Sequence, residues 1–195
     1  MTKAKKRLLT LLLAMLMAVG MAVPTFADEV QPRSLTIPLI NQYVSYGVAT
    51  ANNVEYVMNL PTSAESATEV NLTNMNVNVY NVTGHASQQF MMRSSSGKYY
   101  ITTKLNPKVA LNINNTPKTD TAANGTQFTY YNCNLYPIAS NSASDYQLTY
   151  ERYDYGFYIM LANRTNLKLW TKSLANSANV YWGTTGGVSC GWTNS

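Results

Sequence analysis

The side chains that could carry out chemistry are few in this sequence. It holds one histidine, His85, and two cysteines, Cys133 and Cys190, among 195 residues. A cluster of histidine ligands for a metal ion is therefore excluded, and a Ser-His-Asp triad would depend on His85 alone. Because His85 falls in a Gly-His-Ala turn, an exposed histidine without a special role is the default interpretation. We predict that the protein uses no metal ion and no cofactor.

The acidic residues offer no clear catalytic pair. Glu151 and Asp154 are close in sequence, but they lie beside Arg152, as solvated charges in a turn often do. Asp145 and Glu55 could act as the two carboxylates of a glycosidase only if folding brought them within roughly 5–10 Å of each other. Nothing in the sequence requires this approach, so we predict no catalytic residues. A small secreted enzyme that acts on glycosides is the least favoured alternative.

The N-terminal residues have the pattern of a secretory signal peptide. Four basic residues between positions 3 and 7 precede an apolar run over 8–23, and small residues precede a cleavage site after Ala27. Cleavage would remove four of the 14 basic residues, so the net charge would fall from +5 to +1. Binding to nucleic acid then has no electrostatic support. No later apolar run could span a bilayer. We predict a secreted protein without membrane insertion after cleavage.

Cys133 and Cys190 would leave the reducing cytoplasm with the exported chain. They lie 57 residues apart, and the sequence leaves two interpretations open, one structural disulfide or two buried thiols. On the chain-entropy model a bridge over so large a loop would stabilise the fold by roughly 4 kcal/mol. A catalytic cysteine is not expected, because the spacing is no redox motif and His85 is the only imidazole.

The exported part of the chain has the pattern of an all-β protein. Apolar and polar residues alternate with period two in 76–80 and 127–130, as they do in strands with one buried face. Turn-forming Asn, Gly, Pro and Ser separate such runs about every ten residues. Helical periodicity is almost absent, and 15 tyrosines with few charged residues argue against disorder. These features predict a sandwich or barrel of many short strands.

Internal repetition narrows this prediction. Tyr99-Tyr100-Ile101 recurs 58 residues later as Phe157-Tyr158-Ile159. Apolar triplets follow at similar intervals, Leu111-Asn112-Ile113 in one copy and Leu167-Lys168-Leu169 in the other. A first copy can be completed with Val54-Glu55-Tyr56. Because one four-strand unit would leave unpaired edges, we expect three such units to close around an axis.

With these repeats, the sequence resembles the ricin-type β-trefoil lectin domain. The best match runs from Val77 to Ile113, where Gln88-Gln89-Phe90 stands in place of the Gln-x-Trp motif of that family. Tyr146-Gln147-Leu148 and Cys190-Gly191-Trp192 occupy the corresponding places in the other copies, in eroded form. The resemblance implies that the last residue of each motif lies in the core, and that Gln88 ties its loop to backbone groups.

The resemblance also implies the organisation of the chain. A β-trefoil of three pseudo-symmetric four-strand repeats would cover 43–195, after the signal peptide over 1–27 and an N-terminal arm over 28–42. Pro32 and Pro38 argue against a central strand in that arm.

Each repeat of that family can hold a shallow sugar pocket, in which an acidic side chain binds hydroxyl groups and an aromatic ring stacks on the sugar. Carried over to this sequence, the first copy offers Glu55, Tyr80, Ser87 and Gln88. The second copy offers Asn112, Tyr131 and Asp145, and the third offers Lys168, Asn179 and Trp182. We expect the second pocket to be the most suitable, and the third to be inactive because a lysine has only donors.

The resemblance therefore implies a secreted carbohydrate-binding protein without catalytic activity, whose partners are glycans or glycoconjugates. The competing hypothesis is an extracellular protein-interaction or structural module with decayed sugar pockets, and the missing acids favour it. Tyr80 and Tyr131 could then be ordinary surface residues of a sheet. That family also often has a disulfide within each repeat. Cys133 occupies one of its two places, but Ala110 occupies the other, which leaves Cys190 as the only partner for Cys133.

Overall fold

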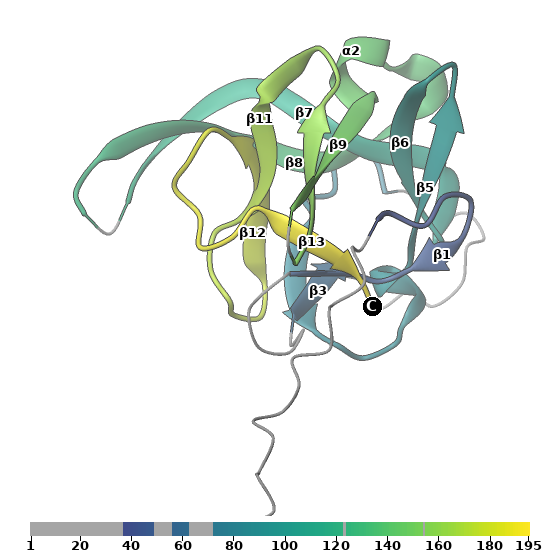
Figure 1. Cartoon of the computed structure of the whole chain (residues 1–195), viewed down its shortest axis with the longest axis horizontal. Coiled ribbons are helices and arrows are strands. Elements are labelled where there is room, and N and C mark those ends of the chain that lie inside the picture. The colour runs from purple at the N-terminus through teal and green to yellow at the C-terminus, as the bar shows by residue number, and fades with distance from the viewer. Residues whose placement is uncertain (1–36, 49–55, 63–71, 123, 154) are drawn as a thin grey trace, which may run out of the picture. The chain divides into compact units, whose positions relative to one another are not determined.

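The chain, seen here in a computed structural model, folds almost entirely into β-strands (Figure 1). The structure describes residues 37–48, 56–62, 72–122, 124–153 and 155–195. Glu55 and the signal peptide predicted over 1–27 lie outside the described residues. Within the described ranges, no helix has the length and apolar character needed to cross a membrane. The prediction of an all-β protein is confirmed.

The described strands fall into three consecutive groups of four. The first group contains β2 (Tyr46–Val48), β3 (Tyr56–Asn59), β4 (Asn78–Asn81) and β5 (Phe90–Ser95), and the short β1 (Tyr43–Val44) precedes it. The second contains β6 (Lys98–Thr103), β7 (Asn106–Thr121), β8 (Gln127–Pro137) and β9 (Leu148–Tyr153). The third contains β10 (Gly156–Leu161), β11 (Arg164–Thr171), β12 (Ala178–Gly183) and β13 (Gly191–Asn194). Three short helical turns complete the described elements: η1 (Ala86–Gln88), η2 (Ile138–Ser140) and α2 (Ala143–Tyr146).

The first and fourth strands of the repeats pair into a closed barrel. In the first repeat the first barrel strand is divided into β1 and β2, and its β1 part pairs with β5, where Val44 faces Phe90. In the other two repeats the fourth strand pairs with the first, and Tyr99 faces Leu148 and Phe157 faces Trp192. Between repeats, β5 pairs with β6, β9 with β10, and β13 with β2. The last pairing joins the two ends of the domain, so the barrel retains no open edge that another chain could extend.

The second and third strands of each repeat form a hairpin, and the three hairpins meet around the same axis. They are β3–β4, β7–β8 and β11–β12. The amide of Val77 donates to the carbonyl oxygen of Cys133 at 3.0 Å, and the amide of Val180 donates to that of Val77 at 3.1 Å. All three side chains are buried. Three hairpins joined in this way confirm the predicted threefold arrangement.

The core confirms the role predicted for the last residue of each Gln-x-Trp-like motif. Phe90, Leu148 and Trp192 are all fully buried, and they face the first strands of their own repeats. The polar nitrogen of the buried Trp192 indole does not lack a hydrogen-bond partner, because Nε1 donates to the carbonyl oxygen of Leu169 at 2.9 Å.

The pairing registers correct two of the triplets aligned from the sequence. Gly47, Thr102 and Met160 are equivalent, because each lies three residues after the residue that faces the end of its repeat's motif. They lie opposite Val57, Ala110 and Lys168, so these three residues are equivalent as well. The equivalent triplets are therefore Met58-Asn59-Leu60, Leu111-Asn112-Ile113 and Leu169-Trp170-Thr171. The alignments of Val54-Glu55-Tyr56 and Leu167-Lys168-Leu169 were wrong. Each alignment is displaced from the observed register by an even number of residues. Such a displacement keeps the same side chains facing the core, so the alternation of apolar and polar residues does not reveal it.

The β7–β8 hairpin is longer than the hairpins of the other repeats and extends away from the barrel (Figure 1). The register shifts between Ile113 and Pro117, and pairing then continues to Thr121 and Gln127. Several side-chain contacts hold the extension against the third repeat. Asp120 pairs with Lys172, and the ring of Phe128 lies over Gly186, where a Cβ would overlap with it.

The two cysteines are free thiols, so the possible disulfide between Cys133 and Cys190 is not formed. The alternative of two buried thiols holds for Cys133, whereas Cys190 is free but only half-buried. Cys133 is fully buried in β8 where the three hairpins meet, whereas Cys190 is half-buried just before β13 of the barrel. The two side chains thus belong to different layers of the fold. Burial raises the pKa of both thiols, which keeps them protonated.

Only the end of the predicted N-terminal arm, 37–42, is described, and it lies beside β5 and β13. Ile40 forms a parallel bridge with Met92, and the amide of Asn41 donates to the carbonyl oxygen of Met92 at 2.8 Å. Asn194 Nδ2 donates to the carbonyl oxygen of Ile37 at 2.6 Å. The arm thereby contacts the fourth strand of the first repeat and the fourth strand of the third.

Candidate functional site

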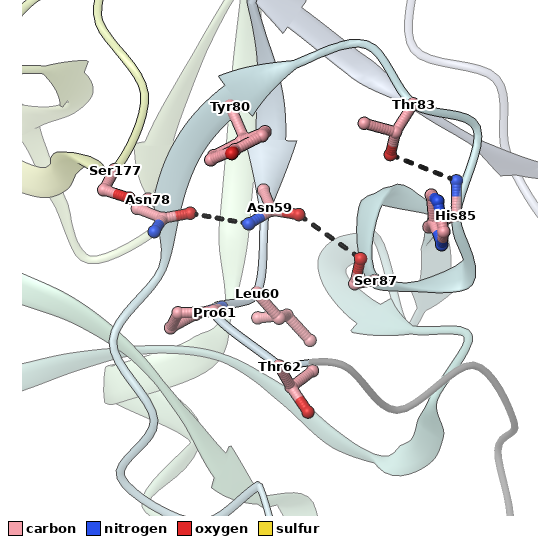
Figure 2. Close-up of a pocket in the computed structure, with 10 residues that line it drawn as sticks. All are labelled: Asn59, Leu60, Pro61, Thr62, Asn78, Tyr80, Thr83, His85, Ser87 and Ser177. Atoms are coloured by element: carbon pink, nitrogen blue, oxygen red, sulfur yellow. Dashed lines mark hydrogen bonds between the residues drawn. The ribbon is translucent and has the colours of Figure 1, made fainter.

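A pocket of about 330 Å³ opens in the first repeat (Figure 2). Its walls come from β3 and the residues after it, from β4, from the turn that leads into η1, and from the third-repeat hairpin. The lining residues are Asn59, Leu60, Pro61, Thr62, Asn78, Tyr80, Thr83, His85, Ser87 and Ser177. The volume lies at the lower end of the range of roughly 300–1,000 Å³ that is typical of small-molecule sites.

Two asparagines form the polar floor of this pocket. Asn59 and Asn78 lie opposite each other on β3 and β4, and Asn59 Nδ2 donates to Asn78 Oδ1 at 2.9 Å. Ser87 Oγ donates to Asn59 Oδ1 at 3.3 Å (Figure 2). All three residues are largely buried, so these bonds fix the amides in one orientation. Within the described part of the chain, Asn78 Nδ2 forms no hydrogen bond and is left to donate to a ligand.

Gln88 holds the turn that forms one wall of the pocket. Its Oε1 accepts hydrogen bonds from the amide and hydroxyl of Thr83, at 2.8 and 3.0 Å, and from the amide of Gly84 at 3.2 Å. Its Nε2 donates to the carbonyl oxygen of Asn81 at 2.8 Å. The side chain is fully buried and both of its polar atoms are bonded. These bonds are the ties to backbone groups that were expected of Gln88, and its buried side chain is not among the residues that line the pocket.

Tyr80 supplies the aromatic surface of the pocket. It follows Val79 on β4, and 37% of its surface is exposed. Figure 2 shows its ring near the Asn59 and Asn78 amides. An exposed ring beside fixed amide groups can pack against the C–H face of a sugar while the polar groups bind its hydroxyls.

The described lining of the pocket carries no carboxylate and no lysine or arginine. His85, taken from the sequence as an ordinary surface histidine, lies in the wall, where Thr83 Oγ1 accepts a bond from its amide at 3.5 Å. Among the described residues, no group of three or more His, Cys, Asp and Glu side chains could hold a metal ion. The pocket can therefore offer hydrogen bonds and stacking rather than charge.

The second copy contains the same asparagine pair, but another side chain closes over it. Asn112 Nδ2 donates to Asn134 Oδ1 at 2.9 Å and to the carbonyl oxygen of Ile113 at 2.9 Å. Asn141 Nδ2 then donates to Asn112 Oδ1 at 2.6 Å. Both polar atoms of Asn112 are thus used within the protein, and the residue is buried.

The other residues expected in the second pocket lie on separate elements. Tyr131 is half-buried on β8, where it faces Pro117 and Trp182 of neighbouring strands. Asp145 belongs to α2, and its Oδ1 lies 3.6 Å from Arg164 Nη2. Among the described residues, no hydrogen bond or ion pair joins Asn112, Tyr131 and Asp145 to one another. The structure therefore favours the first copy over the second.

The third copy has aromatic side chains in place of the asparagine pair. By register, Trp170 and Tyr181 occupy the positions of Asn59 and Asn78, and they face each other on β11 and β12. Phe128 and Tyr130 of the long β7–β8 hairpin pack on Tyr181, with ring centroids 6.1 and 5.1 Å away. The place of the pocket is filled by these rings.

The residues expected to bind sugar in the third copy have other roles. Trp182 is buried, and its Nε1 donates to the carbonyl oxygen of Asn112 at 3.2 Å. Lys168 places its Nζ 3.6 Å from the centre of the Tyr158 ring. Asn179 Nδ2 donates to Asn132 Oδ1 at 3.3 Å, across the junction of two hairpins.

Solved structures, among them the following three, resemble this chain at low sequence identity. A mosquitocidal holotoxin matches with 15% identity and a TM-score of 0.58, over 80% of this chain but only 17% of its own. The designed threefold-symmetric protein ThreeFoil matches with 16% identity and a TM-score of 0.57, over 78% of this chain and 96% of its own. The agglutinin of Rhizoctonia solani matches with 14% identity and a TM-score of 0.51, over 81% and 98%. The fold is a β-trefoil.

These likenesses concern the fold alone, and the sequence itself matches no family model and no curated protein. The trefoil expected from the resemblance to the ricin-type lectin domain is nevertheless present, with its three repeats and its closed barrel. The chain spans almost the whole length of ThreeFoil and of the agglutinin, but a small part of the holotoxin.

Sequence reasoning missed several lining residues of the trefoil pocket. Asn59 carries a detectable signal, because Met58-Asn59-Leu60 repeats the apolar-Asn-apolar pattern of Leu111-Asn112-Ile113. Asn78 has none beyond its place in an alternating strand. Ser177 lies 97 residues from Tyr80 in sequence, and only the pairing of β4 with β12 brings the two together.

Proposed function

We propose that this β-trefoil is a secreted carbohydrate-binding protein and that it binds sugar in the first-repeat pocket. The observation that carries the proposal is the exposed Tyr80 ring beside the fixed Asn59–Asn78 amide pair, in a pocket without charged side chains among its described residues. A sugar presents both an apolar C–H face and a ring of hydroxyls, which such a pocket complements.

Each lining group has a role in this proposal. Tyr80 stacks on the ring of the sugar, and Asn78 Nδ2 and Ser87 Oγ bond its hydroxyls. Asn59 and Gln88 do not contact the ligand but hold these groups in place. Because the pocket is open and uncharged, a single site should bind weakly. A partner that displays many copies of the glycan on one surface should therefore bind more tightly than a single glycan does.

Export and the absence of catalysis belong to the same proposal. The basic head and apolar run over 1–23 support export. Binding without catalysis is supported by the acids of the described chain, none of which lines the pocket. Asp145 pairs with Arg164, Asp120 pairs with Lys172, and Glu151 is exposed on β9. One structural neighbour bears the name of an agglutinin, which agrees with a trefoil that binds glycans.

A glycan array tests the proposal against its rival. The protein should bind a subset of glycans, and Tyr80→Ala should abolish the signal. Tyr131→Ala is the control, because the sequence assigned Tyr131 to the second pocket and Tyr131 does not line the first-repeat pocket, so binding should be unchanged. If no glycan binds at high protein concentration, the proposal fails and a non-catalytic interaction or structural module with decayed pockets takes its place.

A further inference from the structure

The loop of the β11–β12 hairpin is fixed to the strand that carries Tyr80. The amide of Ser177 donates to the carbonyl oxygen of Val79 at 2.9 Å, and the amide of Asn81 donates to Asn176 Oδ1 at 2.9 Å. Val79 and Asn81 are the two neighbours of Tyr80 on β4. A loop of the third repeat is thus attached on both sides of the aromatic residue of the first-repeat pocket.

Ser177 has an unusual backbone conformation at this point. Its φ is 66°, in the left-handed region that residues other than glycine rarely adopt. Such conformations persist only where the surrounding contacts fix them, and they are common at functional sites. Ser177 also lines the pocket, and Figure 2 shows it on the side of Asn78. The loop therefore places a hydroxyl group next to the free amide donor of the floor.

The third repeat shows what a neighbouring hairpin does to a pocket. There the long β7–β8 hairpin of the second repeat reaches across and lays Phe128 and Tyr130 on Tyr181. The rings fill the position that is open in the first repeat. The β11–β12 hairpin is short, with strands of 8 and 6 residues against 16 and 11 in the β7–β8 hairpin, and it leaves its neighbour's pocket open but contributes one wall.

We propose that Ser177 is a specificity-determining residue of the first-repeat pocket and that Asn176 is its positioning residue. This inference rests on the proposed sugar-binding function and deepens it. The Ser177 hydroxyl bonds the substituent of the sugar that points toward the third repeat. Glycans that differ in the configuration or substitution of that carbon are distinguished by a residue from another repeat.

Two matched pairs of variants test this proposal by glycan array and by titration with the best glycan. Ser177→Gly removes the hydroxyl but suits the left-handed backbone, so the thermal midpoint should stay equal or rise while binding weakens about 3- to 10-fold. The rank order of the glycans should also change. Ser96→Gly is its control, since Ser96 has a φ of 48° in the β5–β6 turn, outside the pocket. This control should bind as the wild type does.

The second pair concerns Asn176, whose Oδ1 is the acceptor that holds the loop. Asn176→Ala removes the acceptor and should weaken binding, whereas Asn176→Asp keeps an acceptor and should restore it. A purely structural role would lower the thermal midpoint without changing the rank order of glycans.

The outcomes separate this inference from the function on which it rests. If the wild type binds, Tyr80→Ala does not, and Ser177→Gly keeps the affinity and rank order of the wild type, the role of Ser177 is refuted and the sugar pocket stands. If the wild type binds no glycan, both are refuted.

Discussion

At the scale of residues, the candidate site is shaped mainly by buried side chains of asparagine and glutamine. Gln88 connects four polar groups of one turn, and Asn59 and Asn78 bond each other beneath it. Burying an amide without a hydrogen bond costs free energy, so each of these side chains is stable in its position only while its hydrogen-bond partners are present. The turn and the pocket floor are thus rigid before any ligand arrives.

Gln88→Ala should therefore destabilise the protein by about 2–3 kcal/mol, because it leaves several backbone and hydroxyl groups of the turn without partners. Urea unfolding followed by tryptophan fluorescence measures this change. Gln89→Ala is the control, since the neighbouring side chain is only half-buried and bonds Lys104 at the surface. Its effect should stay within about 0.5 kcal/mol. Equal effects of the two variants would contradict the scaffold role.

The two thiols give a second prediction at this scale. Reducing agent should leave the thermal midpoint unchanged, because Cys133 and Cys190 are not bridged. A thiol reagent should modify both cysteines after denaturation, but it should react slowly with Cys190 and not with Cys133 in the folded protein. Burial and the raised pKa of both thiols suppress the reactive thiolate. A midpoint that falls with reducing agent would indicate a disulfide.

At the scale of elements, the hairpins decide which repeat keeps an open pocket. The extended β7–β8 hairpin covers the third repeat through Phe128 and Tyr130, and the short β11–β12 hairpin borders the first. The extension depends on close contact, since the Phe128 ring lies where a side chain on Gly186 would be.

Gly186→Ala should consequently destabilise the protein more than Gly125→Ala does. Both glycines have a left-handed φ, at 102° and 81°, but a Cβ on Gly125 would meet nothing. An alanine in the left-handed conformation should lower the free energy of unfolding by about 1 kcal/mol at either position. The displacement of Phe128 should add about 1–3 kcal/mol at Gly186 alone. Equal unfolding free energies would show that the hairpin does not rest on this contact.

The sequence predicts the elements better than it predicts their registers. Alternation and turn residues reveal the strands, and the interval between Ile101 and Ile159 reveals two of the repeats. Alternation cannot fix a register, however, because a shift by two residues keeps the same face inward. Glu55 and Lys168 were assigned to the wrong positions for this reason, and Asn59 and Trp170 stand there instead.

At the scale of the whole molecule, threefold symmetry is complete in the barrel and broken at the surface. The barrel needs all three repeats, because β13 must pair with β2 to close it. The surface does not need this symmetry, and the three hairpins differ in length and in their contacts. The sequence could predict Tyr80 and the Gln88 turn from local motifs. It could not predict the filling of the second and third pockets, which arises from Asn141, Phe128 and Tyr130 packing over distant strands.

Trp192→Ala tests the closure of the barrel. The indole is fully buried and sits beside the pairing of β13 with β10 and β2. Its removal should cost about 3–5 kcal/mol, which is a large part of the stability of an ordinary domain. Circular dichroism and urea unfolding report the loss. Tyr155→Ala, at an exposed tyrosine, should by comparison change little.

The most direct test of the central claim is a calorimetric titration of the protein with the glycan that the array selects. The open pocket of the first repeat, the filled amide pair of the second and the covered position of the third predict one site per chain. The heat of binding should disappear in Tyr80→Ala and persist in Tyr131→Ala. Two or three equivalent sites, or binding that survives Tyr80→Ala, would contradict the account.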